Sequence, residues 1–154
     1  MLAFDEQLSE RFTQALQAGG RAWRLALERQ LKACGLTPAG WSAVAALAEM
    51  ARAAEEGARP PSQTELAQHL GVDGATLVAT IDRLAVAGLI ERIQSRQDRR
   101  VKLVVLTQQG KEIEEKVRVQ ADTLRRGVLA RLDPGQLVVA SAVLEQLQQA
   151  LEGT

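Results

Sequence analysis

The stretch that decides the fold is TELAQHLGVDGATLVATIDRLAVAGLIERIQSRQDRRVKLVVLTQQG, residues 64–110. Just before and within it, Ser62 and Glu65 form a capping box, in which each side chain accepts a hydrogen bond from a free backbone N–H at a helix start. Gly71 ends this short helix, because glycine readily adopts the left-handed conformation that follows a last turn. Asp73 can cap a second helix after a tight turn. Two helices joined in this way predict a helix-turn-helix.

The second helix, over about residues 74–87, is expected to have a polar outer ridge. Leu77, Ile81 and Leu84 fall at spacings of four and three, so they should face the core. The opposite face should then present small and polar side chains, namely Ala75, Thr76, Ala79, Thr80 and Arg83. Such a ridge can enter a major groove and contact phosphates or base edges. A merely solvated helix face would show the same pattern.

A short charged hairpin is predicted next, with strands over residues 89–93 and 101–106. The basic residues between Arg92 and Lys102 are Arg92, Arg96, Arg99, Arg100 and Lys102. They face one acidic residue, Asp98, although the whole chain balances 19 Lys and Arg against 19 Asp and Glu. Asp98, two residues before Arg100, can hold one of the arginines in a fixed pose, which suits a narrow minor groove. The alternative is a charged hairpin that only prevents aggregation of the sheet edge.

Helical patterns extend to both ends of the chain, so the expected fold is mostly α with a small antiparallel β wing, a winged helix-turn-helix. Residues 1–154 should form one domain, with 38–106 as the DNA-binding lobe. The helices within 1–34 and 108–154 have more apolar positions than so small a lobe can cover. These helices are therefore expected to form a homodimer interface, unless they pack only within the chain.

Composition argues against three other classes of protein: membrane proteins, zinc proteins and enzymes. No apolar run reaches the roughly 20 residues of a membrane span, and the N-terminus lacks a signal-peptide pattern, so a cytoplasmic protein is expected. One cysteine, Cys34, and one histidine, His69, are too few ligands for a structural zinc site. No cofactor is expected. His69 has no acid or nucleophile beside it in sequence, which argues against an enzyme.

The stretch 64–110 strongly resembles the MarR family, most closely its SlyA branch. The resemblance lies in the Asp98-x-Arg100 pair and in the pattern of Leu106, Thr107 and Gly110 that follows the hairpin. It extends upstream through AWRLALERQLKACGLTPAGW, residues 22–41. It implies a sequence-specific transcriptional regulator, expected to be a repressor, that binds a pseudo-palindromic operator as a homodimer. Its terminal helices would form the dimer, and its wings would reach the minor groove.

The resemblance also assigns DNA contacts to the helix-turn-helix and the wing. These residues are Ser62, Thr64, Gly74, Ala75, Thr76, Thr80, Arg83, Arg96, Asp98, Arg99 and Arg100. Ala75 and Ala79 depart from the pattern, because SlyA-like chains often have a proline and a longer polar or basic residue there. Few base-reading groups remain, so DNA shape and backbone contacts should contribute much of the binding.

Effector binding is a further implication of the resemblance. Family members commonly respond to small aromatic acids or phenolic compounds, and Trp23 and Trp41 lie where pocket walls are implied, with Arg24 able to meet a carboxylate. The alternative is that both tryptophans are core anchors. Two other hypotheses stay open: a redox-sensing regulator based on Cys34, and a winged-helix module that binds only protein.

Overall fold

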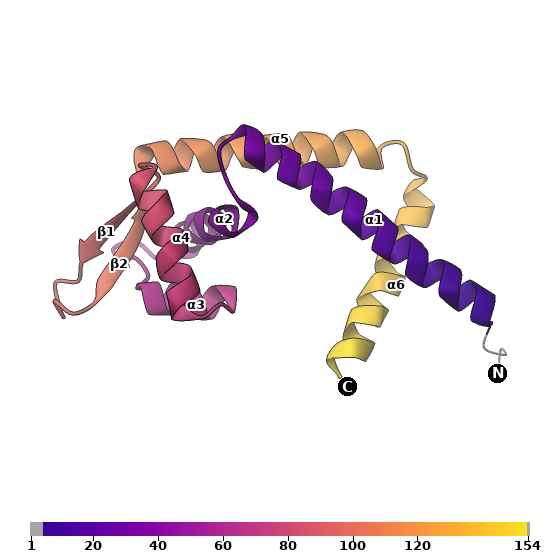
Figure 1. Ribbon diagram of the computed structural model, residues 1–154, viewed down its shortest axis with the longest axis horizontal. Coiled ribbons are helices and arrows are strands. Elements are labelled where there is room, and N and C mark those ends of the chain that lie inside the picture. Colours follow the sequence, from indigo (N-terminus) through magenta and orange to yellow (C-terminus); the bar gives the residue numbers. More distant parts are fainter. Residues whose placement is uncertain (1–4, 154) are drawn as a thin grey trace. The chain divides into compact units, whose positions relative to one another are not determined.

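The computed structural model describes residues 5–153 and has mainly helical architecture (Figure 1). Its elements are α1 (Glu6–Ala33), α2 (Pro38–Ala53), α3 (Gln63–Leu70), α4 (Gly74–Val86), β1 (Ile90–Gln94), β2 (Lys102–Leu106), α5 (Gln108–Leu129) and α6 (Pro134–Glu152). The predicted fold class is confirmed, with β1 and β2 as the small antiparallel sheet. Within the described residues no single helix is long and apolar enough to cross a membrane; only the sharply bent pair α5 and α6 together meets that test of length and composition.

The chain divides into two compact units, Met1–Arg118 and Val119–Thr154. The boundary lies inside α5. The first unit contains the helix-turn-helix and the hairpin, and the second contains α6 and the end of α5.

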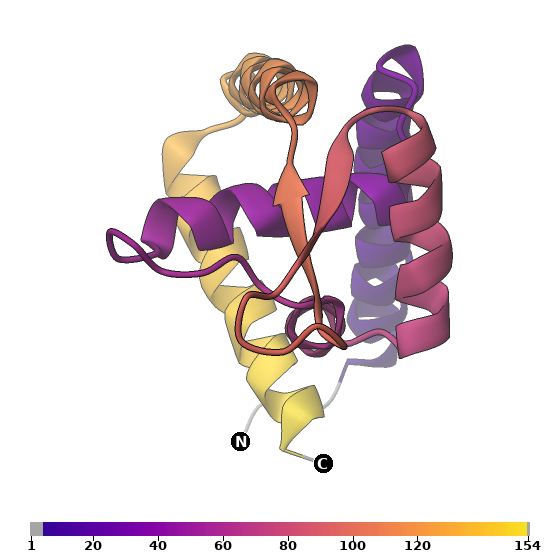
Figure 2. The ribbon, with the colours of Figure 1, turned by 90° about the vertical axis from the view of Figure 1, so that its left-hand side faces the viewer.

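The helix-turn-helix begins and ends where its capping residues predict. The Ser62 hydroxyl accepts a hydrogen bond from the Glu65 backbone N–H, and the Glu65 carboxylate accepts one from the Ser62 backbone N–H. Gly71 follows α3 with a φ of 66°, and Asp73 is the N-cap of α4. Figure 2 shows α3 end-on and α4 upright, so their axes run in clearly different directions.

The hairpin is anchored at its base to the start of α3. Its register pairs Ile90 with Leu106 at one end and Gln94 with Lys102 at the other. The backbone N–H of Val104 donates to the carbonyl oxygen of Pro61 at 2.9 Å, just before α3 begins. The base of the wing is therefore part of the helix-turn-helix lobe, and its tip extends beyond it.

One hydrophobic core joins the helices of the first unit to the hairpin. Its most deeply buried side chains are Val44 from α2, Leu66 from α3, Leu77 and Ile81 from α4, and Val104 from β2. Burying a side chain of this size stabilises a fold by roughly 1.5–3 kcal/mol. This core therefore fixes α4 and β2 on the same scaffold.

The terminal helices bury few of their side chains. Leu31 is the only buried residue of α1, and α6 has none among the residues that the structure describes. Large apolar side chains stay exposed instead, including Leu8 at 62%, Val138 at 71% and Val139 at 64%. The apolar excess expected from the sequence is thus present on the surface of this single chain.

Candidate nucleic-acid interface

The start of α4 is held by Asp73, whose carboxylate accepts two hydrogen bonds from Thr76. The backbone N–H of Thr76 donates to Oδ1 at 2.8 Å, and its hydroxyl donates to Oδ2 at 2.6 Å. These bonds, the hydroxyl's first, lower the pKa of Asp73 from its ordinary value. Because the hydroxyl proton of Thr76 points to Asp73, its oxygen is left to accept a hydrogen bond from a base amino group.

Thr80 does not lie on the outer ridge, so its predicted exposure is wrong. Thr80 is only 7% exposed, and its hydroxyl donates to the Thr76 carbonyl oxygen at 3.1 Å. The physical reason is that α4 packs against α2, α3 and β1, which buries a wide arc of the helix. Thr80 stands three residues after Leu77 and four before Leu84, and this core spacing was a signal available in the sequence.

Ser62 is also unsuited to reach DNA with its side chain. It is 8% exposed, and its hydroxyl is used in the cap of α3. The remaining candidates of the helix-turn-helix are exposed: Thr64, Gly74, Ala75, Thr76 and Arg83. Arg83 donates from Nε to the Ala79 carbonyl oxygen at 3.3 Å, which leaves its other guanidinium N–H groups for a partner outside the chain.

The wing tip is organised by hydrogen bonds to its backbone. Ser95 is buried, and its hydroxyl accepts from the backbone N–H groups of Gln97 and Asp98 at 3.3 and 3.5 Å. The Gln94 side chain donates to the Arg99 carbonyl oxygen at 3.1 Å. Sequence analysis missed both residues, although a serine before a charged turn is a common sign of such side-chain hydrogen bonding.

Asp98 fixes Arg100 in a different way from the one predicted. Its Oδ1 accepts from the Arg100 backbone N–H at 3.0 Å. No ion pair joins the Asp98 carboxylate to a guanidinium among residues 5–153. Asp98 thus shapes the turn, and the Arg100 side chain stays free of it.

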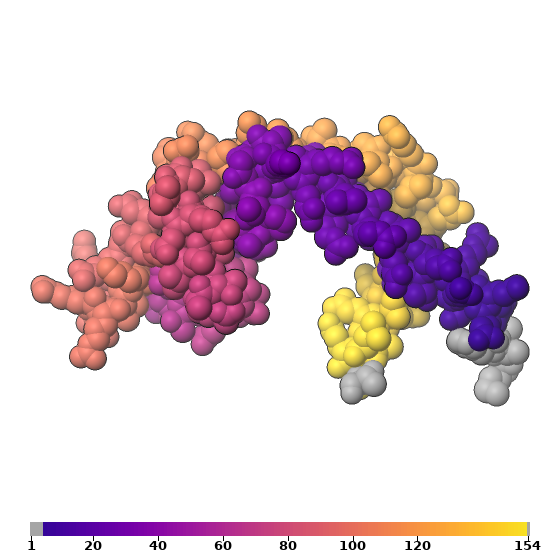
Figure 3. Space-filling view, in the orientation of Figure 1, coloured from indigo at the N-terminus to yellow at the C-terminus, as the bar shows by residue number. Residues whose placement is uncertain are grey.

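The three tip arginines present unpaired positive charge. Arg96, Arg99 and Arg100 are exposed, and within the described part of the chain their guanidinium groups have neither a hydrogen-bond acceptor nor an ion-pair partner. Figure 3 shows the hairpin tip standing out from the helices of the first unit. Such an arrangement suits a polyanion, because free guanidinium groups bind phosphates through paired N–H donors.

Arg92 is different from the other basic residues of this segment. Its Nη2 lies 2.5 Å from Asp82 Oδ1 on α4, and its Nε lies 2.5 Å from Gln63 Oε1 on α3. It is therefore occupied inside the lobe. The local positive excess counted from the sequence overstates the charge that is free to meet DNA.

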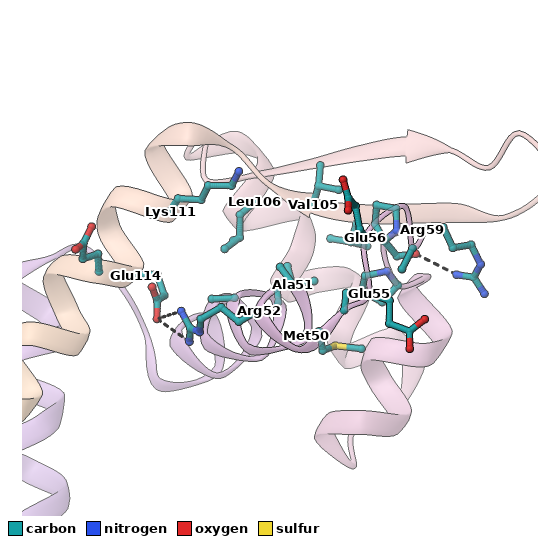
Figure 4. Close-up of a pocket in the computed structure, with 18 of the residues that line it drawn as sticks. Met50, Ala51, Arg52, Glu55, Glu56, Arg59, Val105, Leu106, Lys111 and Glu114 are labelled. Carbon is teal, nitrogen blue, oxygen red and sulfur yellow. Dashed lines mark hydrogen bonds and ion pairs between the residues drawn. The ribbon is translucent and has the colours of Figure 1, made fainter.

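A cavity of about 730 Å³ lies between the end of α2, the loop that follows it, β2 and the start of α5. Its apolar wall includes Leu47, Met50, Ala51, Val104 and Leu106, and its charged residues include Arg52, Lys111, Glu114 and Arg118. In Figure 4, Arg52 points to Glu114, while Lys111 and Leu106 lie across from Ala51. Buried Glu114 is 3.4 Å from Arg52 Nη1 and 3.5 Å from Arg118 Nε.

The residues implied as an effector site are not among those that line this cavity. Trp41 is half-buried and packs against the core, as a core anchor would. Trp23 is 37% exposed on α1, and Arg24 is also exposed. Core anchoring therefore describes Trp41 and not Trp23. Cys34 is half-buried at the C-cap of α1.

Known proteins share both the motif and the fold. The model of the MarR family matches residues 35–101. The structure of transcriptional regulator PA3341 is 33% identical over 93% of this chain and 99% of that chain, with a TM-score of 0.66.

Two more distant structures contain ligands and show likeness of fold. A mutant of Staphylococcus aureus MepR, bound to an oligodeoxyribonucleotide, is 18% identical over 91% of this chain and 97% of that chain, with a TM-score of 0.66. Staphylococcus aureus MarR, in complex with salicylate and kanamycin, is 22% identical over 96% of this chain and 95% of that chain, with a TM-score of 0.74.

Proposed function

The chain belongs to the MarR family of transcriptional regulators, and we propose that it binds a pseudo-palindromic operator as a homodimer. In this proposal α4 enters the major groove and the hairpin tip reaches the adjacent minor groove. The observation that supports it best is the wing tip, where three exposed guanidinium groups have no partner in residues 5–153, together with the exposed side chains at the start of α4. The assignment to the SlyA branch stays a prediction.

Base reading by α4 is expected to be limited. Its exposed candidates are Ala75, Thr76 and Arg83, of which Arg83 can donate to guanine and Thr76 can accept from an amino group. Thr64 and Gly74 can approach the phosphate backbone beside them. The wing and the DNA shape therefore account for much of the proposed affinity. The DNA-bound MepR mutant supports this class of partner.

The homodimer is supported by the apolar surface of α1 and α6. Leu8 on α1 and Val138 and Val139 on α6 are each more than half exposed. Large apolar side chains that gather on a helix surface are costly in water unless a partner covers them. A two-fold dimer also presents two identical reading heads, which a pseudo-palindromic site requires.

The proposal is tested by isolating bound genomic fragments, defining the operator, and measuring its affinity by fluorescence anisotropy at several salt concentrations. We expect steep salt dependence, because phosphate contacts release counterions. Arg100→Ala should weaken binding about tenfold or more, and Thr76→Ala should cost less, since a hydrogen bond to a charged group is worth about 1.5–3 kcal/mol and one between neutral groups about 0.5–1.5 kcal/mol. The alternative is a protein-binding module. That function is supported if the chain selects no DNA sequence and if Arg100→Ala leaves its binding to other molecules unchanged.

Response to a small aromatic acid or phenol is the second part of the proposal. The cavity supports it, because its apolar side chains lie beside Lys111, which has no ion-pair partner among residues 5–153 and can receive a carboxylate, whereas Arg52 and Arg118 are paired with Glu114. The salicylate complex of Staphylococcus aureus MarR supports the ligand class. A ligand there would touch β2, a strand of the wing, and can release DNA only by binding the DNA-free conformation more tightly.

Operator release by a panel of aromatic acids tests this part. Ala51→Phe should suppress release by filling the cavity, while Trp41→Phe should leave it intact. If Trp41→Phe suppresses release and Ala51→Phe does not, the ligand binds near Trp41 instead. Ligand binding by Trp41, Trp23 and Arg24 stays a prediction. No release by any member of the panel would remove the proposed effector class.

A further inference from the structure

We propose that Arg92 is a positioning residue that holds the wing at a fixed angle to α4, so that both elements meet DNA as one rigid unit. This inference rests on the proposed DNA binding. It assigns to Arg92 a task different from that of the tip arginines, with which it shares a basic segment of the sequence.

The contacts of Arg92 join three elements. Arg92 is the middle residue of β1, Gln63 is the first residue of α3, and Asp82 lies on α4. The guanidinium donates through Nε to Gln63 and through Nη2 to Asp82. One side chain thus ties the strand that leads to the wing tip to both helices of the helix-turn-helix.

The chemistry of this junction requires a guanidinium. The N–H groups of arginine lie in one rigid plane and point in different directions, so they can serve two acceptors at once. A lysine ammonium keeps the charge but lacks this planar fork. The side chain of Arg92 is 26% exposed and that of Asp82 is 59% exposed, so water screens the pair and its main effect is on geometry rather than on global stability.

The other side of the hairpin is held independently. Arg92 pairs across the sheet with Val104, which is fully buried, and the Val104 backbone is bonded to Pro61. Loss of the Arg92 contacts would therefore leave the base of the hairpin in the core. The tip, at residues 95–101, would gain freedom to swing relative to α4.

Arg92→Lys in the chain of residues 1–154 is the decisive variant, because it keeps the net charge. Arg96→Lys is the matched control at the wing tip. We expect Arg92→Lys to weaken operator binding roughly tenfold, as for coupled groups in one network, with the slope of log affinity against log salt unchanged. In an Asp82→Asn background the same substitution should cost less. Arg96→Lys should cost less than Arg92→Lys, because the Arg96 side chain has no partner among the described residues and a lysine ammonium still binds a phosphate.

Three results would overturn the proposal. Full affinity of Arg92→Lys would mean that charge alone suffices. A salt slope smaller by about one in Arg92→Gln would show that Arg92 contacts a phosphate directly. A drop in affinity matched by a growing unfolded fraction in thermal melts would indicate a merely structural role.

Amide hydrogen exchange of the free protein separates this inference from DNA binding itself. Arg92→Lys should increase exchange in residues 95–101 and leave the core amides of α4 protected. Unchanged exchange at the tip would refute the positioning role even if operator binding is real. Increased exchange in a chain that binds no operator would refute the proposed function and leave the role of Arg92 in holding the wing intact.

Discussion

At the scale of single residues, backbone hydrogen bonds determine how the wing arginines are presented. Asp98 accepts from the Arg100 backbone N–H and thereby shapes the turn that projects Arg99 and Arg100. Simple electrostatics would predict that removing this carboxylate strengthens binding to a polyanion. The geometry predicts weaker binding for a substitution that also removes the acceptor of the Arg100 backbone N–H, because the turn then loses a hydrogen bond.

Asp98→Ala should therefore weaken operator binding about fivefold, the equivalent of one ordinary hydrogen bond of about 1 kcal/mol. Asp98→Asn keeps an acceptor oxygen without the charge, so it should bind as tightly as the wild type or more tightly. Anisotropy titrations at one salt concentration compare the two. Tighter binding by Asp98→Ala would show that charge outweighs the turn.

Asp73 supplies a residue-scale prediction about pH. Its hydrogen bonds from Thr76 lower its pKa in the folded chain from the ordinary value of 3.8. Its contribution to stability is therefore complete above that value and is lost as the pH falls through the lowered folded pKa. The melting temperatures of the wild type and Asp73→Ala should differ at neutral pH and converge in strong acid.

Asp73→Asn is the control for this titration, because asparagine also caps helices but does not ionise in this range. Position 73 should lose its stabilising effect in acid only in the wild type. The difference in melting temperature between Asp73→Asn and the wild type should therefore shrink as the pH falls. A constant gap between the wild type and Asp73→Ala at every pH would contradict the role of the charged carboxylate.

Single residues also mark where sequence reasoning succeeded and where it failed. The exposure of Arg83, Arg96 and Arg100 followed from local pattern alone, since charged side chains in a turn or on an outer face stay in water. Thr80 was misplaced because its hydroxyl bonds to its own helix, which lets a polar side chain enter the core. The partners of Arg92 lie on α3 and α4, and such long-range pairing leaves no periodic signal.

At the scale of elements, the join between the hairpin and α5 requires close backbone approach at Gly110. A Cβ added there would lie 2.1 Å from the Leu89 carbonyl oxygen. The Thr107 hydroxyl, next to it, donates to the Gly88 carbonyl oxygen and accepts from the Gly110 backbone N–H. The pattern of Leu106, Thr107 and Gly110 noted in the sequence thus has a steric cause.

Gly110→Ala should destabilise the chain by about 1–3 kcal/mol, as overpacking does when backbone must move. Gly127→Ala in the same helix is the matched control, because a Cβ there has open space within 4 Å. That control should be neutral or stabilise by up to about 1 kcal/mol, since alanine favours helix more than glycine does. Urea unfolding of both variants measures the difference. Equal stability of the two variants would mean that α5 shifts freely at this join.

Element boundaries were the most predictable feature, because caps are local. Ser62 and Asp73 each cap the start of a helix by accepting a hydrogen bond from a backbone N–H, as their positions in the sequence indicated. The cavity could not be predicted, since its walls come from α2, β2 and α5, which are distant in sequence. Trp23 and Trp41 were predicted as pocket walls from the resemblance alone. Residue type does not specify which side chains line the same cavity.

At the scale of the whole molecule, the proposed dimer explains why α6 has exposed apolar side chains, which are unfavourable in water. Leu144 is 43% exposed in α6, where no described residue is buried. Leu144→Lys should therefore shift the chain from dimer to monomer in analytical ultracentrifugation, because it places a charge in the proposed apolar interface. Val86→Lys is the control, since Val86 is 91% exposed on α4, away from α6 in sequence and in the other compact unit.

Operator binding should follow the oligomeric state, because a monomer can engage only one half-site and loses the second binding event that a dimer makes intramolecular. Leu144→Lys should bind a single half-site and the full operator with similar affinity, whereas the Val86→Lys dimer should still prefer the full operator. A monomeric Leu144→Lys that retains that preference would separate DNA reading from dimerisation. A variant that stays dimeric would instead move the interface away from this face of α6.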